Sequence, residues 1–206
     1  MPNKLSKHSY VAKTKEDALN KCYEELNVKE EEIYVKETQI AGKLFKASKI
    51  ELEVLTQKEL VDFIKYYINQ IGTLMGLDIK TEIRTSDKII NVTLICENNA
   101  ILIGKDGRTL NAIQNLLRQS ISVQSGFNVK INIDVCGYKE KRKKRFEREI
   151  KNICRSLLRD HIEVKLDPMN SYQRRIVHNV VNKYEDLKTE SIGEEPNRYV
   201  VISYKK

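Results

Sequence analysis

The sequence has 206 residues, of which 40% are hydrophobic and 32% are charged, enough for one large domain or two to three small ones. No apolar run approaches the roughly 20 residues that a membrane helix needs, and the first residues lack the apolar core of a signal peptide, so we expect a cytoplasmic protein without stable membrane insertion. Because the four cysteines and three histidines form no cluster of about four ligands, the sequence predicts no metal site and no cofactor.

The net charge of +8 is unevenly distributed along the chain. Residues 1–57 carry ten Lys/Arg and ten Asp/Glu, and residues 58–136 carry nine and eight. Residues 137–206 carry eighteen and eleven, which leaves a net +7 in the last third. That third is therefore expected to face a polyanion.

Residues 1–55 predict a small module with the order strand, helix, strand, strand. The first strand is expected at 9–12, and Thr14 is the predicted cap of the helix. A stripe of apolar residues at helical spacing follows, formed by Ala18, Leu19, Cys22, Tyr23 and Leu26. Strands at 32–38 and 49–54 complete the module, in which no residue suggests chemistry.

Residues 56–136 predict the order helix, strand, strand, helix, helix, strand. Thr56 and Glu59 form a capping box that opens the first helix, and Gly76 is expected to end it. Alternating apolar residues then predict three strands, at 79–85, 88–96 and 129–135. A short helical turn and a longer helix, separated by a glycine-bounded loop, lie between the second and third of these strands.

The loop Gly104-Lys105-Asp106-Gly107 joins these two helices. Such a tight connection needs backbone conformations that residues with a Cβ resist. It also lets a phosphodiester approach main-chain N–H groups at the start of the following helix, where the helix dipole favours an anion. Lys105 and Arg108 would add positive charge beside that phosphate. The bases would then lie in the groove between the helix pair and strand 88–96.

The pattern Ile-Gly-x-x-Gly-x-x-Leu, from Ile103 to Leu110, together with its flanking elements resembles a KH domain of the bacterial type II order. The resemblance implies that the loop clamps about four nucleotides. Two other interpretations stay open for this segment. It could be a helical packing corner without a ligand, or a KH domain that keeps the fold and binds only protein.

The last third begins with a long helix, predicted over 138–161. Its apolar residues fall on one stripe, formed by Phe146, Ile150, Ile153 and Leu157. The opposite side carries cations, namely Lys141, Lys144, Arg148, Arg155 and Arg159, with Lys151 beside them. A solvated helix face is one interpretation, but the one-sided charge favours neutralisation of a nucleic-acid backbone.

A strand at 163–166, a second helix and two further strands complete the last third, with these three elements at 171–184, 188–191 and 199–204. Arg174 and His178 lie one turn apart on that helix and share a face. Alone, such a pair is usually structural. The segments around it, 167–178 and 193–198, resemble the domain that is named for an Arg and a His separated by three residues and that binds single-stranded nucleic acid.

A small N-terminal module, a KH domain and this third domain follow one another as in the Jag family of bacterial SpoIIIJ-associated proteins. The resemblance covers essentially the whole chain, although Ser171 and Gln173 stand where the family commonly has Pro and Glu. It implies a cytoplasmic RNA chaperone or post-transcriptional regulator linked to cell shape and envelope homeostasis. It also implies a small single-KH protein as a partner, and it leaves the oligomeric state open.

The sequence thus predicts an α+β protein of three small modules, 1–55, 56–136 and 137–206, that binds single-stranded RNA without catalysis. The predicted contacts are Gly104, Lys105, Asp106, Gly107, Arg108, Lys141, Lys144, Arg148, Arg155, Arg174 and His178. No Ser/His/Asp or Cys/His arrangement indicates an enzyme, and Glu194 and Glu195 are expected to be solvated. Two alternatives remain: an adaptor for a membrane-insertion or cell-division complex, and a single-stranded DNA binder.

Overall fold

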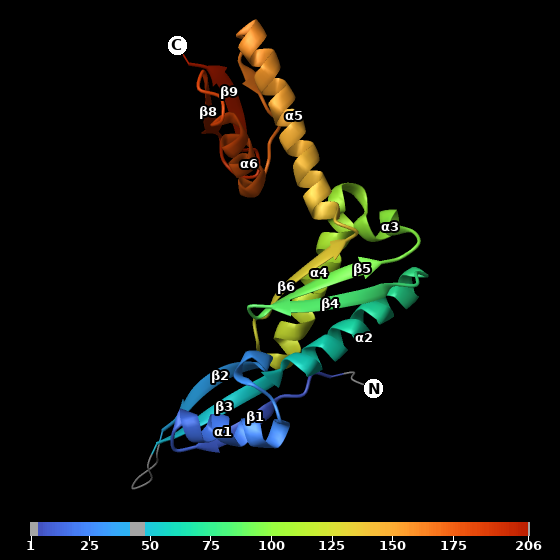
Figure 1. The fold of residues 1–206 in the computed structure, drawn as a ribbon, viewed down its shortest axis with the longest axis vertical. Helices are drawn as coiled ribbons and strands as arrows, with labels where there is room; N and C mark the ends of the chain where they lie inside the picture. Colours follow the sequence, from blue (N-terminus) through green and yellow to red (C-terminus); the bar gives the residue numbers. More distant parts are fainter. Residues whose placement is uncertain (1–3, 42–47, 206) are drawn as a thin grey trace. The chain divides into compact units, whose positions relative to one another are not determined.

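The computed structural model describes residues 4–41 and 48–205. The chain separates into two compact units, an N-terminal unit of Met1–Cys136 and a C-terminal unit of Gly137–Lys206 (Figure 1). Both units combine helices with strands, which confirms the α+β class. Because the predicted boundary near residue 55 falls inside the N-terminal unit, the division into three modules stays a prediction.

The first half of the N-terminal unit is a three-stranded antiparallel sheet with one helix. It is formed by β1 (His8–Ala12), α1 (Lys15–Leu26), the short helix η1 (Glu30–Glu32), β2 (Ile33–Ile40) and β3 (Lys49–Thr56), with the strand order β1-β3-β2. The predicted cap is confirmed, since the Thr14 side chain accepts a hydrogen bond from the Asp17 N–H. Ala18 and Cys22 on α1 are fully buried and pack against β1 and β3, so the apolar stripe faces the sheet as expected.

The second half of this unit has the predicted order of the KH domain. Its elements are α2 (Gln57–Met75), β4 (Lys80–Ser86), β5 (Ile89–Ile95), α3 (Asn99–Ile103), η2 (Lys105–Gly107), α4 (Arg108–Ser125) and β6 (Lys130–Val135). In the sheet β4-β5-β6, β5 pairs antiparallel with β4 and parallel with β6. Thr56 and Glu59 form the predicted capping box, and Gly76 ends α2 in the left-handed conformation.

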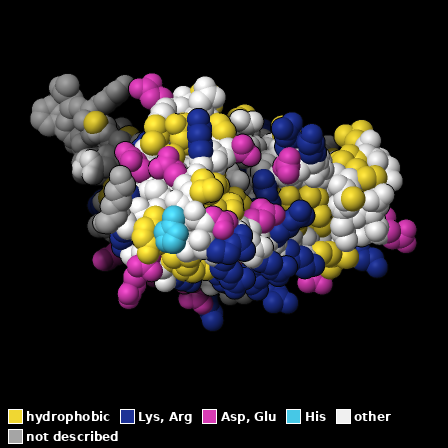
Figure 2. Space-filling model, turned by 90° about the horizontal axis from the view of Figure 1, so that it is seen from above, with side chains coloured by type: hydrophobic (Ala, Val, Ile, Leu, Met, Phe, Trp, Pro, Cys, Tyr) yellow, Lys and Arg dark blue, Asp and Glu magenta, His cyan; other side chains and the backbone are white. Residues whose placement is uncertain are grey.

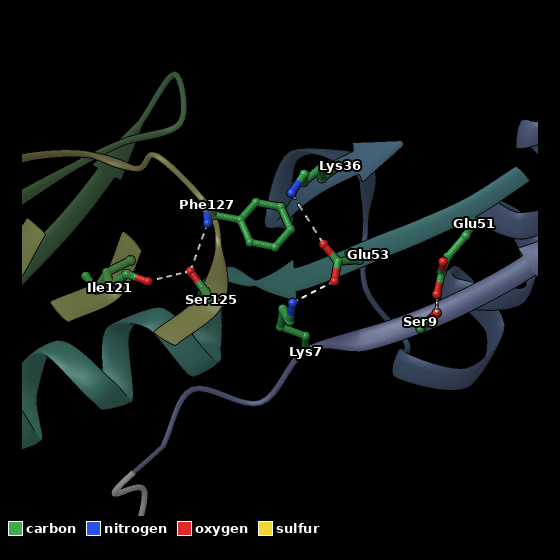
Figure 3. Close-up of polar contacts among 8 residues, drawn as sticks. All are labelled: Lys7, Ser9, Lys36, Glu51, Glu53, Ile121, Ser125 and Phe127. Atoms are coloured by element: carbon green, nitrogen blue, oxygen red, sulfur yellow. Dashed lines mark hydrogen bonds and ion pairs between the residues drawn. The ribbon is translucent and has the colours of Figure 1, made fainter. Parts of the chain in front are cut away.

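The two sheets of the N-terminal unit meet at the end of α4. The Ser125 hydroxyl accepts from the Phe127 N–H at 3.1 Å and donates to the Ile121 carbonyl at 2.6 Å (Figure 3). Figure 3 shows the Phe127 ring directed toward the sheet on which Glu53 is held between Lys7 and Lys36. Phe127 is only 7% exposed. This contact therefore fixes the end of α4 that is opposite the glycine-bounded loop.

The C-terminal unit packs two helices on a three-stranded antiparallel sheet. It is formed by α5 (Tyr138–Asp160), β7 (Val164–Lys165), α6 (Ser171–Val181), β8 (Leu187–Ile192) and β9 (Tyr199–Tyr204), with the strand order β7-β9-β8. Ile150, Cys154 and Leu157 on α5 are at most 1% exposed and belong to one core with α6, β8 and β9. The apolar stripe predicted on α5 is therefore the inner side of this helix.

The second helix of the C-terminal unit ends earlier than its sequence pattern predicts. α6 stops at Val181 instead of residue 184. The N–H of Lys183 donates to the Val180 carbonyl and that of Tyr184 to the Val181 carbonyl, so the chain continues in three-residue turns. Tyr184 still packs against the core, which explains why its position follows the apolar stripe.

Within residues 4–41 and 48–205, no helix is long and apolar enough to cross a membrane. In the same residues, no three or more His, Cys, Asp or Glu side chains gather in a group that could hold a metal ion.

Candidate nucleic-acid interface

The glycine-bounded loop is a sharp reversal between α3 and α4. The Gly104 N–H closes α3 on the Ala100 carbonyl at 2.8 Å, and Gly104 itself has φ 67° and ψ 179°. Asp106 and Gly107 also have positive φ, at 54° and 75°. Three positive φ angles in four residues turn the chain directly into α4, as the glycines at 104 and 107 predict.

Both the backbone conformation and a close contact with Thr109 require glycine at position 104. Its φ and ψ lie in a region that is essentially restricted to glycine. A Cβ on Gly104 would collide with the Thr109 Oγ1 atom and lie 2.9 Å from the Thr109 Cβ. The backbone of the loop therefore approaches the first turn of α4 so closely that no side chain fits there.

The start of α4 has no side-chain cap from its own N-cap residue, although the Arg108 N–H donates to the Lys105 carbonyl. Gly107, its N-cap residue, supplies no side-chain acceptor to the first N–H groups, and the first turn holds no acidic residue. Lys105 and Arg108 are both exposed beside it. A helix N-terminus with this charge can accept a phosphate on its main-chain N–H groups. The structure thus brings Lys105, Gly107 and Arg108 together at one place, as predicted.

The cations of α5 fall into two groups. Lys143, Lys144 and Arg145 pair four residues along the helix, with the carboxylates of Glu147, Glu140 and Glu149 at 3.9, 3.5 and 3.2 Å. Lys141, Arg148 and Arg155 are exposed, and among the described residues no carboxylate lies within 4.0 Å of their charged groups. Of the four α5 residues that were predicted contacts, Lys144 is thus the one engaged in an ion pair.

Arg174 is turned into the C-terminal unit. It is only 8% exposed, and its Nη1 donates to the Met169 carbonyl at 2.7 Å and to the Glu195 carboxylate at 2.8 Å. Glu195 lies in the turn between β8 and β9, and its side chain is 59% exposed. The guanidinium therefore ties that turn to the start of α6. Whether Arg174 also contacts nucleic acid stays a prediction.

His178 joins α6 to β8. Its Nδ1 lies 2.6 Å from the Thr189 Oγ1, and its Nε2 lies 3.0 Å from the Ser191 Oγ. Burial of the ring, and to a lesser extent the positive charge of Arg174, lowers the pKa of His178 below its usual value. The imidazole is thus held neutral at the centre of a polar contact between helix and sheet. Its predicted contact with nucleic acid is likewise untested by the structure.

Comparison with known proteins assigns the KH domain and the C-terminal unit each to a described family. Residues 61–133 match the family described as KhpA/KhpB, KH domain, and residues 142–204 match the family of the R-3-H domain, named for its Arg-xxx-His pair. The chain is 34% identical to the RNA-binding protein KhpB of Clostridium symbiosum over 95% of this chain and 90% of that protein. The chain belongs to the KhpB/Jag family. The Jag resemblance seen in the sequence is thereby confirmed.

Other KhpB proteins match over shorter parts of the chain. The KhpB protein of Bacillus subtilis is 30% identical over 69% of this chain and 69% of its own length. That of Lactiplantibacillus plantarum is 28% identical over 72% of this chain and 45% of its own length. The KH match contains the whole glycine-bounded loop, and the Arg-xxx-His domain match contains most of α5 together with Arg174 and His178. Every predicted contact except Lys141 thus lies inside one of the two domain matches.

Three residues that hold Arg174 and His178 in place were not among the predicted contacts. Glu195 was expected to be solvated, but its carboxylate holds Arg174. Thr189 and Ser191 hold His178. A sequence signal existed for the last two, since they alternate along one face of a strand. None existed for Glu195, whose partner lies 21 residues away in the chain.

Acidification below about pH 6.5 is expected to destabilise the C-terminal unit through His178. Because the pKa of His178 is lowered in the folded unit, the unfolded chain takes up a proton at a pH where the folded unit does not. The stability present above the unfolded pKa therefore declines as the pH falls toward the lowered folded value. Urea unfolding between about pH 7 and pH 5 should show a smaller loss for His178→Gln than for the natural chain. Equal losses in both proteins would assign the acid sensitivity to other groups.

Proposed function

We propose that this protein binds single-stranded RNA, with the loop Gly104–Gly107 as a clamp on the sugar-phosphate backbone. The observation that carries the proposal is the loop itself, which only glycine can form at residue 104 and which places the exposed Lys105 and Arg108 at the start of α4. The relatives that cover most of this chain are named RNA-binding proteins, which supports RNA as the ligand. Binding without catalysis is part of the proposal.

In the proposed mechanism the main-chain N–H groups at the start of α4 bind one phosphate of the RNA backbone. Lys105 and Arg108 reach neighbouring phosphates, and Gly104 and Gly107 let the backbone approach. Asp106, in the left-handed conformation, completes the turn between them. Neighbouring bases would lie in the groove between the helix pair α3–α4 and β5. Because no aromatic side chain lies on β5, recognition would rest on hydrogen bonds more than on stacking.

The C-terminal unit supplies a second contact in this proposal. Lys141, Lys144, Arg148 and Arg155 of α5 would neutralise further phosphates. Arg174 and His178 support this surface by holding the turn after β8 and the strand β8 itself. Direct contact of these two side chains with RNA is kept as a proposal. A cytoplasmic location and a role in RNA regulation linked to cell shape and envelope homeostasis are the finer proposals, supported by the Jag resemblance alone.

The clamp is tested by reversing one charge in the loop. We expect Lys105→Glu to weaken binding of a mixed-sequence single-stranded RNA by about tenfold or more, because it places a carboxylate where a phosphate would lie. The log–log salt slope should also become shallower by about 0.7 for the lost contact. Fluorescence anisotropy across a salt series measures both quantities.

The matched control is Lys130→Glu, which makes the same charge change at the exposed start of β6. Since α4 has 18 residues, Lys130 lies at the far end of a helix about 27 Å long. Equal losses of RNA affinity in both variants would mean that only the net charge of the protein matters, which would contradict the clamp. An oligonucleotide of DNA with the same sequence separates RNA from single-stranded DNA, because only RNA offers the 2′-OH. If no nucleic acid binds, the adaptor alternative takes its place.

We further propose a small single-KH protein as a partner that docks on the outer face of α4. The inner face of this helix is buried, but Leu116 is 52% exposed and Val123 is 86% exposed, seven residues apart on the outer face. Ala112 lies one turn before Leu116 and is also exposed. The family description KhpA/KhpB joins two proteins through one kind of KH domain, which supports a partner with the same fold.

A further inference from the structure

One strip along α5 is strongly basic. In Figure 2, dark-blue Lys and Arg side chains gather in a band across the lower middle of the view. At 100° per residue, the side of α5 that faces away from the buried Ile150, Cys154 and Leu157 carries one carboxylate, that of Glu149, which pairs with Arg145. The cations on this side are Lys141, Lys144, Arg145, Arg148, Arg155 and Arg159, with Lys151 at the edge.

Only part of this strip is available to a new partner. Lys144 and Arg145 already pair with glutamates on the flanks of the helix, and Arg159 pairs with Asp160 at 2.8 Å. On this strip, three exposed cations have no carboxylate of the described residues within 4.0 Å, namely Lys141, Arg148 and Arg155. They recur every seven residues. Seven residues are close to two turns, so the three lie almost on a line parallel to the helix axis.

We propose that Lys141, Arg148 and Arg155 form a track that binds successive phosphates of one RNA single strand without reading its sequence. This proposal rests on the RNA binding proposed above. It names the residues of the C-terminal contact that bind the RNA backbone. At 1.5 Å per residue the three residues are spaced by about 10.5 Å and span about 21 Å, a length that several nucleotides of an extended strand would cover. The line defined by these residues is called the α5 track.

The composition of α5 favours binding to the RNA backbone over two other roles of a basic helix, namely binding to a membrane and stacking on bases. A helix that lies on a membrane needs an exposed apolar face, but the apolar side of α5 is sealed in the core by Ile150, Cys154 and Leu157. Base recognition by stacking needs aromatic side chains. On α5 these are Phe146, which packs against that same core, and the half-buried Tyr138 at the first residue of the helix, before the basic strip begins. The strip therefore offers charge at regular intervals, which matches the repeating charge of a nucleic-acid backbone.

The test compares two triple variants that remove the same charge from the same helix of the full chain. K141Q/R148Q/R155Q removes the α5 track, and K143Q/R145Q/R159Q removes three cations that are already paired and are not among the proposed RNA contacts. For the first, we expect the log–log salt slope of binding to a mixed-sequence RNA to become shallower by about 2, at about 0.7 per phosphate, and the affinity at about 0.1 M salt to fall about a hundredfold. For the second, the fall should be less than about tenfold. The charge-conserving K141R/R148K/R155K should bind like the natural chain.

Several outcomes would overturn the proposal. Equal losses in the two triple variants would mean that only net charge matters. Unchanged RNA affinity in K141Q/R148Q/R155Q would remove the track, and if that variant instead lost binding to phosphatidylglycerol vesicles, the line would serve a membrane. Loss of binding by Lys105→Glu with no loss in the track variant would leave the loop clamp standing and the track wrong. The reverse result would support the track and contradict the clamp. Far-UV circular dichroism shows whether each variant is folded.

Discussion

Replacing Gly104 with alanine is expected to lower the free energy of unfolding of the N-terminal unit by about 2–4 kcal/mol and to abolish RNA binding by the loop. Two penalties combine. A residue with a Cβ is strained at φ 67° and ψ 179°, and the new methyl group would collide with the Thr109 side chain. To relieve the collision, the loop must move away from the start of α4, which separates Lys105 from the main-chain N–H groups of that helix.

Gly76→Ala is the matched control for Gly104→Ala. Gly76 also has a positive φ, of 67°, but nothing lies within 4 Å of the position that its Cβ would occupy. Only the backbone strain remains, so we expect a loss of about 1 kcal/mol and unchanged RNA binding. Chemical unfolding and RNA anisotropy of the two variants measure the difference. If both variants lost the same stability and both kept RNA binding, the close approach of Gly104 to Thr109 would have no functional role.

Replacing Arg174 with alanine is expected to destabilise the C-terminal unit by about 2–3 kcal/mol. The variant leaves the Met169 carbonyl without its charged donor, frees the turn that holds Glu195 and opens space in a position that is only 8% exposed. Arg174→Lys should recover only part of the loss, because an ammonium group cannot reproduce the planar fork of a guanidinium. Amide hydrogen exchange in the peptides that cover α6 and β8 reports on this unit alone.

Arg175→Ala provides the control for this prediction. Arg175 is the next residue of α6 and is exposed, so its removal is expected to change the stability by no more than about 0.5 kcal/mol. RNA affinity separates the two roles of Arg174. If Arg174→Ala kept full stability and lost RNA binding, Arg174 would be a direct contact, and its hydrogen bonds with Met169 and Glu195 would be incidental to the fold.

Local sequence patterns predicted most elements of the fold, because each depends on residues close together in the chain. The capping box of Thr56 and Glu59, the glycine end of α2 and the alternating strand β6 are all confirmed. The glycine-bounded loop was predicted for the same reason, since the glycines that its backbone conformation requires lie within four consecutive residues. The early end of α6 was missed because three-residue turns keep Tyr184 on the apolar stripe.

The features that the sequence could not predict depend on contacts between distant residues. The Glu195 carboxylate meets Arg174 only because the turn after β8 folds back over the start of α6. Glu147 stands four residues from both Lys143 and Lys151, and its pairing with Lys143 at 3.9 Å depends on side-chain rotamers that the spacing does not give. The burial of Phe127 against the sheet that carries Lys36 and Glu53 likewise has no local signature.

The connection between β6 and α5 has a kinetic consequence. β6 ends at Val135 and α5 begins at Tyr138, so only Cys136 and Gly137 separate the KH domain from the basic helix. So short a connection keeps the local concentration of either proposed RNA contact high for a strand held at the other. A strand released at one contact would then be recaptured before it diffuses away. We therefore expect the dissociation rate, more than the association rate, to distinguish RNAs long enough to reach both contacts from RNAs that reach only one.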